Sequence, residues 1–351
     1  MHASLATFLL LGLNLLAVQL PASDPAEAAW AAAMALKQRS SHEEAAASFA
    51  KFKVDFPGSP RAVACTVEEG VCWFAAGRAV QVFHQTTAAA QERFDRAMGL
   101  FRSVTSEHAQ APEAPRAFYM QGSTHLFGGE LKAAELDYST VIEKYAADRT
   151  YFGKALDQRA LVRRHLLLVQ PAILDLRRWI KEVAEPPAML AKMNGQLARA
   201  LMLDRPAPAY QGDVWFNGDP VPLESQAGNL LALYFFATWC TNCEAELPYL
   251  QELERRYGPQ GLRVLGVVNR EKEQTPEIVR AYLAEKHISF SVLQDGGATS
   301  QKYRVGTIPM LALIDRRGVL RWCDNPSVLP QATLERLVNE GSSLGDKGGA
   351  K

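Results

Sequence analysis

The sequence predicts a multidomain chain, in which an all-α helical domain precedes an α/β domain. Its 351 residues exceed what one small domain needs. From residue 26 to residue 203, apolar residues recur at spacings of three and four with few glycine or proline clusters, which is typical of consecutive helices. From residue 206 to residue 344, short apolar runs alternate with helical patterns, which is typical of an α/β fold.

The composition is that of a globular protein without a dominant charge. Hydrophobic residues make up 48% of the chain, so both domains can bury a core. The 38 basic residues are balanced by 38 acidic residues. We therefore expect neither nucleic acid nor an anionic membrane surface as a partner, because both attract basic patches.

Residues 1–22 have the pattern of a signal peptide, an apolar run from Leu5 to Leu20 followed by Pro21 and small residues. An uncleaved membrane anchor is the alternative, although the run is shorter than the roughly 20 residues of a spanning helix. We expect the protein in an exported compartment, periplasmic or on the extracytoplasmic side of a membrane, where disulfides persist. The tail, residues 345–351, is expected to be disordered.

Small and aromatic residues recur in the helical domain at intervals that resemble a tetratricopeptide repeat. In residues 118–146, Gly122 and Gly129 would let two helices approach, and Tyr138 would fill the gap. Residues 45–57 fit the same pattern. A helical bundle without repeats is the alternative. In both cases, stacked amphipathic helices leave a grooved face that usually binds a partner or a neighbouring domain.

Two of the five cysteines, Cys65 and Cys72, lie in the helical domain. On one helix they share a face but lie about 10.5 Å apart along the axis. A disulfide needs Cα atoms about 5.5 Å apart. We therefore expect two buried thiols, unless the helix breaks near Gly70. Because the number of cysteines is odd, at least one stays unpaired within the monomer.

The α/β domain follows two prolines at 186–187 and a short helix at 188–203. The run LLALYFF at 230–236 is apolar throughout, as expected for a central strand that is covered on both faces. The other expected elements are a hairpin in 215–221, a helix from the cysteine motif to 257, a strand at 262–268, a helix at 275–286, an extended piece at 289–293, a short helix at 299–303, a hairpin of 311–314 and 319–323, and a helix at 331–340.

The stretch YFFATWCTNCEAELPYL, residues 234–250, places Cys240 and Cys243 where the central strand meets a helix. The stretches PAPAY, LRVLGVVN and VGTIPMLALIDRRGVL accompany it in the same domain. Through these motifs, residues 206–344 resemble the thioredoxin fold and, within it, the exported TlpA/ResA-like thiol-disulfide oxidoreductases. Several motifs in the right order are a stronger signal than an isolated C-x-x-C.

Thiol-disulfide exchange needs an accessible thiolate that attacks and a second thiol that releases the mixed disulfide. At a helix N-terminus, backbone N–H groups and the helix dipole favour a thiolate on Cys240, whereas Cys243 lies one turn further and is more buried. We expect Cys240 as the nucleophile, Cys243 as the resolving thiol and no bound cofactor. A structural zinc site would need four ligands, and no second C-x-x-C or paired histidines follow. A purely structural disulfide would gain little from so short a loop.

The resemblance implies further site residues. Pro309 matches the cis-proline of the family, which packs beside the sulfurs and exposes the backbone of Ile308 to a substrate strand. Thr307 belongs to the same substrate-binding loop, and Trp239 is expected to cover the cysteine pair and to restrict access to it. Glu246 falls where TlpA/ResA-like proteins carry a glutamate that modulates proton transfer. An ordinary carboxylate on the helix surface is the alternative for Glu246.

The motif departs from its relatives at several positions. Tyr234 stands where thioredoxin has a buried aspartate, so a proton shuttle would have to use Glu246 or water. Glu244 adds a carboxylate that opposes the helix dipole. We therefore expect the pKa of Cys240 to be higher than in strong oxidases, which favours reductase chemistry. Thr241 and Asn242 replace the usual proline-containing pair and leave the reduction potential open.

The sequence thus predicts an exported thiol-disulfide oxidoreductase that reduces or exchanges disulfides in partner proteins and draws on a thiol-disulfide electron donor. The helical domain would position a partner or the active site. A peroxidase of the peroxiredoxin branch is one alternative, but that branch has a threonine where this chain has Ala237. A scaffold whose helices carry the function is another. Cys323 is expected to be a core residue and not a third redox partner.

Overall fold

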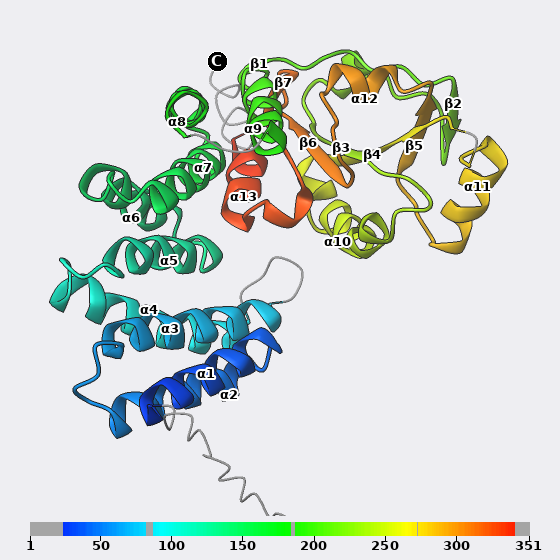
Figure 1. The fold of residues 1–351 in the computed structure, drawn as a ribbon. Coiled ribbons are helices and arrows are strands. Elements are labelled where there is room, and N and C mark those ends of the chain that lie inside the picture. The colour runs from blue at the N-terminus through cyan, green and yellow to red at the C-terminus, as the bar shows by residue number, and fades with distance from the viewer. Residues whose placement is uncertain (1–23, 82–86, 184–186, 272, 341–351) are drawn as a thin grey trace, which may run out of the picture.

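The chain folds into a stack of helices followed by an α/β domain, as the sequence predicts (Figure 1). The computed structural model describes residues 24–81, 87–183, 187–271 and 273–340. The predicted signal peptide and the predicted disordered tail lie outside these ranges. Among the helices in these ranges, none combines the length and the apolar character that crossing a bilayer requires.

In the described part of the chain, nine helices precede the first strand. Each packs mainly on the helices next to it in sequence, which produces the layered stack in Figure 1. The helices are α1 (Pro25–Gln38), α2 (His42–Asp55), α3 (Ala62–Ala79), α4 (Ala88–Glu107), α5 (Ala114–Phe127), α6 (Leu131–Lys144), α7 (Arg149–His165), α8 (Val169–Glu182) and α9 (Pro187–Ala200).

Glycines that face aromatic rings bring neighbouring helices close together. A Cβ atom on Gly122 of α5 would lie 2.9 Å from the ring of Tyr138 in α6. A Cβ atom on Gly70 of α3 would lie 2.6 Å from the ring of Phe101 in α4. Both distances are too short for a real Cβ atom. The contact of Gly122 with Tyr138 is the one that the sequence analysis expected, while the tetratricopeptide assignment itself stays a prediction.

The α3 helix runs unbroken through Gly70, and Cys65 and Cys72 are buried free cysteines, as predicted. Burial raises the pKa of both thiols to about 11. Both are therefore protonated at neutral pH.

The α/β domain is built on a mixed sheet, which has seven strands within the described ranges in the order β1-β7-β6-β3-β4-β5-β2. The central strand β3 is fully buried, as predicted, and it is parallel to β4 and antiparallel to β6. The strands are β1 (Arg205–Pro206), β2 (Val214–Phe216), β3 (Leu230–Phe235), β4 (Leu262–Asn269), β5 (Ser291–Asp295), β6 (Met310–Ile314) and β7 (Val319–Asp324). The helices are α10 (Thr241–Tyr257), α11 (Pro276–Glu285), α12 (Ala298–Lys302) and α13 (Gln331–Asn339).

The predicted hairpin in residues 215–221 is wrong. β2 is an edge strand that pairs with β5 and not with the residues that follow it. The chain turns at Asn217 and Gly218, which have φ angles of 59° and 140°. The Asn217 side chain donates hydrogen bonds to the carbonyl groups of Ile288 and Phe290. These bonds hold the turn against the segment that leads into β5. The sequence thus indicates the turn correctly, but the strand that pairs with β2 lies far away in the sequence.

Helices cover both faces of the sheet. On one face, α10, α11 and α13 contribute Leu250, Val279 and Leu337 to a common buried cluster. The opposite face belongs to a buried cluster that continues through α5 to α9 and includes Met193 and Ala200 of α9. Helices α5 to α9 and the sheet therefore share one hydrophobic core, while α1 to α4 contribute to separate clusters.

Polar contacts also join the helical stack to the α/β domain. Arg164, near the end of α7 and 3% exposed, forms an ion pair of 2.6 Å with Asp324 of β7. The hydroxyl of Thr333 in α13 donates a hydrogen bond of 2.8 Å to the carbonyl of His165. A buried, hydrogen-bonded ion pair tolerates little displacement, because an unpaired buried charge is costly. These contacts fix α7 against β7 and α13.

Candidate active site

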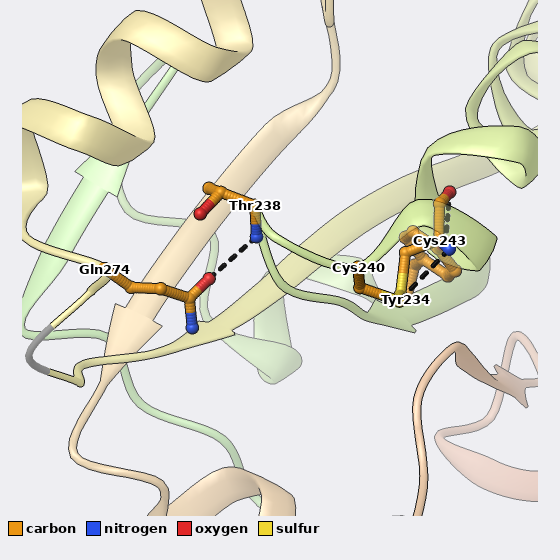
Figure 2. Close-up of a disulfide and its surroundings, with 5 residues drawn as sticks. All are labelled: Tyr234, Thr238, Cys240, Cys243 and Gln274. Atoms are coloured by element: carbon orange, nitrogen blue, oxygen red, sulfur yellow. Dashed lines mark hydrogen bonds between the residues drawn. A yellow bond between two sulfur atoms is a disulfide. The ribbon is translucent and has the colours of Figure 1, made fainter.

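Cys240 and Cys243 form a disulfide where α10 begins, with Cα atoms 5.2 Å apart (Figure 2). Cys240 is the N-cap residue of α10, and its Sγ accepts a hydrogen bond of 3.1 Å from the backbone N–H of Cys243. Cys240 is 8% exposed, whereas Cys243 is completely buried. This difference in burial suits an attacking thiol at position 240 and a resolving thiol at position 243.

Glu244, in the first turn of α10, is paired with a lysine. Its Oε1 lies 2.7 Å from Nζ of Lys286. Hydrogen bonds to Glu244 and Glu285 raise the pKa of Lys286. The lysine charge offsets the carboxylate that was expected to oppose a thiolate on Cys240, so the structure weakens that argument for a less acidic thiol. Lys286 is separated from Glu244 in the sequence by a strand and a helix, and no sequence motif indicates this ion pair.

Tyr234 ties the central strand β3 to the first turn of α10. Its hydroxyl donates a hydrogen bond of 2.9 Å to the carbonyl of Cys243 (Figure 2), and its ring stacks on Phe236 with centroids 5.4 Å apart. Burial raises the pKa of Tyr234, with a further contribution from the charge of Glu246. Tyr234 is therefore a neutral hydrogen-bond donor at the position where thioredoxin has a carboxylate.

Gln274 holds the loop that precedes the disulfide. It lies between β4 and α11 and is 1% exposed. Its Oε1 accepts a hydrogen bond of 2.8 Å from the N–H of Thr238 (Figure 2), and its Nε2 donates to the carbonyl of Asn269 at 3.1 Å. Sequence reasoning missed Gln274, because a single glutamine in a loop belongs to no motif. Its role depends on which backbone group the fold places beside it.

A pocket of about 180 Å³ beside the disulfide is lined by Trp239, Thr307 and Ile308. The sequence analysis placed these three residues at a substrate-binding surface, and the structure brings them together. Trp239 is 58% exposed, so its indole ring is available to a substrate. Because the side chains of Gln274 and Asn269 also line the pocket, the loop that Gln274 holds forms part of its wall.

The Ile308–Pro309 peptide bond is cis, as predicted. Pro309 directly precedes β6, whose first residue Met310 pairs with Phe235 at the end of β3. The proline therefore lies beside the chain segment that leads to the disulfide. Ile308 packs against the buried cluster that contains both Cys240 and Cys243.

Glu246 lines a different cavity from the one formed by Trp239, Thr307 and Ile308. This cavity has a volume of about 840 Å³ and lies between α10 and the helical stack. The structure thus separates Glu246 from the substrate-binding residues that the resemblance implied. A role of Glu246 in proton transfer stays a prediction.

Cys323 is a buried core residue, as predicted. Its Sγ lies 3.9 Å from Sδ of Met310 in the neighbouring strand, and burial raises its pKa to about 12. Across the residues that the structure describes, no group of three or more histidine, cysteine, aspartate or glutamate side chains could hold a metal ion.

Comparison with known proteins gives the relatives of the α/β domain. Residues 203–323 match the AhpC/TSA family. The thioredoxin-like protein YneN of Bacillus subtilis is 29% identical over 105 residues, which are 30% of this chain and 61% of that protein. The thiol-disulfide oxidoreductase ResA of Oceanobacillus iheyensis is 31% identical over 118 residues, which are 33% of this chain and 58% of that protein. The chain thus spans about 60% of the length of these relatives.

Solved structures give similar matches. A thiol:disulfide interchange protein of the thioredoxin family from Chlorobium tepidum is 24% identical, with a TM-score of 0.33. The match covers 39% of this chain and 94% of that protein. A thiol-disulfide isomerase from Corynebacterium glutamicum is 23% identical, with a TM-score of 0.34, over 38% of this chain and 95% of its own. Residues 203–323, which match the AhpC/TSA family, thus form a domain with a thioredoxin-like fold, preceded here by a stack of helices.

Proposed function

We propose that the protein is an exported thiol-disulfide oxidoreductase that reduces or exchanges disulfides in partner proteins. The observation that carries this proposal is the Cys240–Cys243 disulfide at the N-terminus of α10, in which Cys240 is 8% exposed and Cys243 is completely buried. The named activity of the ResA relatives supports the same reaction class.

The reaction needs only the two cysteines and a second thiol-disulfide pair. In the reduced protein, the Cys240 thiolate attacks one sulfur of the client disulfide, and the other client sulfur leaves as a thiolate. Cys243 then loses its proton and attacks Sγ of Cys240. The mixed disulfide breaks, the second client thiolate is released, and the disulfide seen in the structure forms. A thiol donor restores the dithiol, so two electrons pass from donor to client in each cycle.

Neighbouring groups favour the first step. The N–H of Cys243 points to Sγ of Cys240, and the helix N-terminus adds favourable partial charge for a thiolate. We assign Trp239, Thr307 and Ile308 to the surface that contacts the client next to its disulfide, since they line one pocket. Glu246, one turn after Cys243, is assigned to proton transfer in the resolving step on the resemblance alone.

Insulin reduction with dithiothreitol as the electron donor tests this function. Cys240→Ser should lower turnover about a thousandfold or to background, because removing a nucleophile removes the covalent step. Cys243→Ser should accumulate a mixed disulfide with insulin that is visible on a non-reducing gel. Cys323→Ala is the matched control and should keep turnover within twofold, since this cysteine is buried in the core. Undiminished turnover in Cys240→Ser would show that the proposal is wrong.

The same proteins separate the two alternatives. A peroxidase would consume hydrogen peroxide faster than it reduces insulin. The residue expected to assist that reaction is absent, because position 237 is a buried alanine without a hydroxyl group. A scaffold would keep its partner binding in the Cys240→Ser, Cys243→Ser double variant and would show no turnover in the wild type.

A further inference from the structure

The cavity that contains Glu246 is a candidate binding site with walls from both parts of the chain. Its volume is about 840 Å³, within the range of common ligand sites. The helical stack contributes the ends of α3, α5 and α7, while the thioredoxin-like domain contributes α10 and the start of α13. Apolar and charged side chains both face it, among them Leu161, Leu329, Arg78 and Glu335.

The imidazole ring of His165, in the wall of this cavity, has no hydrogen-bond partner among the described residues. Its side chain is nine-tenths or more buried, with 2% of the residue exposed, and within the described ranges neither ring nitrogen has a partner. Burial lowers its pKa to about 3, so the ring is neutral at physiological pH and carries one donor and one acceptor. An unpaired buried polar group is costly and rare. Because both ring nitrogens are themselves buried, His165 gives this wall of the cavity a neutral ring and not a charged group.

The cavity begins close to the disulfide on the exposed face of α10. Ala245 lines the cavity and follows Thr241 by one helical turn, so both residues share that face. Ala245 is five residues after Cys240, which is about 7.5 Å along the helix axis. An extended chain advances about 3.3 Å per residue. Because Ala245 also lies about 140° around the helix from Cys240, a polypeptide bonded to Cys240 would reach the cavity after roughly three residues.

We propose that this cavity binds the segment of the client polypeptide that lies next to its reactive cysteine. One apolar client side chain packs against Leu161 and Leu329, which line the cavity. The inference rests on the proposed function and names its partner as an unfolded or extended polypeptide. In this arrangement, the helical stack supplies one wall of the cavity that binds the client.

Peptides that carry a coloured leaving group test the proposal. Each is a ten-residue, serine-rich peptide whose single cysteine is joined to 5-thio-2-nitrobenzoate by a disulfide. One has phenylalanine three residues before the cysteine, one has it three residues after, and one has serine at both places. The Cys240 thiolate displaces the nitrothiobenzoate anion, and Cys243 then releases the peptide thiol. With protein that is reduced beforehand and reacts once, the rate of nitrothiobenzoate release gives a second-order rate constant for each peptide.

The expected result is that one phenylalanine peptide reacts at least tenfold faster than the serine peptide, because the cavity buries its ring. Ala332→Trp and Ala245→Trp fill the cavity from two exposed positions and should reduce this preference to below threefold. Ala284→Trp, at an exposed position in α11 that does not line the cavity, is the matched control and should keep the preference.

Two outcomes would overturn the proposal. One is that neither phenylalanine peptide exceeds the serine peptide by more than twofold in the wild type. The other is that the preference persists in both cavity variants or disappears in the Ala284→Trp control. In either case, release that depends on Cys240 would leave the oxidoreductase function intact. If the wild type releases nitrothiobenzoate no faster than Cys240→Ser, the proposed function itself fails.

Discussion

The chain contains two helices that each carry two cysteines, and they differ in where the cysteines lie. In α3, Cys65 is the fourth residue of the helix and Cys72 lies in its middle, and both are fully buried. In α10, Cys240 is the N-cap and Cys243 lies in the first turn. Only the second pair has a cysteine at the N-cap, where a backbone N–H group reaches the sulfur and can stabilise a thiolate, and only its spacing permits a disulfide. The position of a cysteine within a helix thus decides its chemistry.

The surroundings of the α3 pair strengthen this contrast. Cys65 and Cys72 belong to an apolar cluster that includes Phe49 and Phe52. Desolvation is the largest cause of their raised pKa values. A thiol with a pKa of about 11 forms about a hundredfold fewer thiolates at neutral pH than one with the reference value of 9.0.

Native alkylation should show the largest difference between the two pairs. With reduced protein at pH 7.5 and iodoacetamide, we expect Cys240 to react at least a hundredfold faster than Cys65 or Cys72, because alkylation requires a thiolate. The rate at the α3 cysteines should rise about tenfold per pH unit up to about pH 11, where their thiols ionise. Mass spectrometry of peptides after timed quenching measures each site. Equal alkylation rates at Cys240 and at the two α3 cysteines would show that the two pairs do not differ in reactivity.

Gln274→Met should have an intermediate effect. The change keeps the side-chain length but leaves the N–H of Thr238 and the carbonyl of Asn269 without their hydrogen bonds. We expect about a tenfold loss of kcat/KM for insulin, because the loop before Cys240 loses its anchor, and a stability loss of about 1–3 kcal/mol. Insulin turnover as a function of pH measures the loss of activity. Urea unfolding measures the loss of stability.

Controls for Gln274 separate positioning from stability. Gln251→Met removes an exposed hydrogen bond to the carbonyl of His287 and should change turnover less than twofold. Gln274→Glu keeps an acceptor for Thr238 and should recover part of the activity. A Gln274→Met protein with lower stability but an unchanged pH profile and KM would assign this glutamine a structural role only.

Lys286→Met should have the smallest effect. Without the lysine, the Glu244 carboxylate is uncompensated and disfavours the thiolate, so the pKa of Cys240 should rise by less than one unit. We expect a two- to fivefold slower reaction at pH 7. The ultraviolet absorbance of the thiolate as a function of pH measures the shift. The Glu244→Gln, Lys286→Met double variant should return close to the wild-type value, and a lysine effect that survives in it would rule out this ion pair as the cause.

Most of the fold could be predicted from local patterns. The buried strand β3 follows from an unbroken apolar run, and the start of α10 follows from the cysteine motif at the strand end. The pairing of β2 with β5 could not be predicted, because Asn217 reaches carbonyl groups far away in sequence. For the same reason, the roles of Gln274 and Lys286 depend on loops and helices that only the folded chain brings together.

The core shared by the helical stack and the sheet has a consequence for how the stack ends. A row of stacked helices leaves an apolar face at each end, and such arrays need a terminal cap for solubility. At the C-terminal end, Met193 and Ala200 of α9 lie in one cluster with the side chains of the sheet. The thioredoxin-like domain is therefore the C-terminal cap of the stack, and removing it would expose an apolar surface that promotes aggregation.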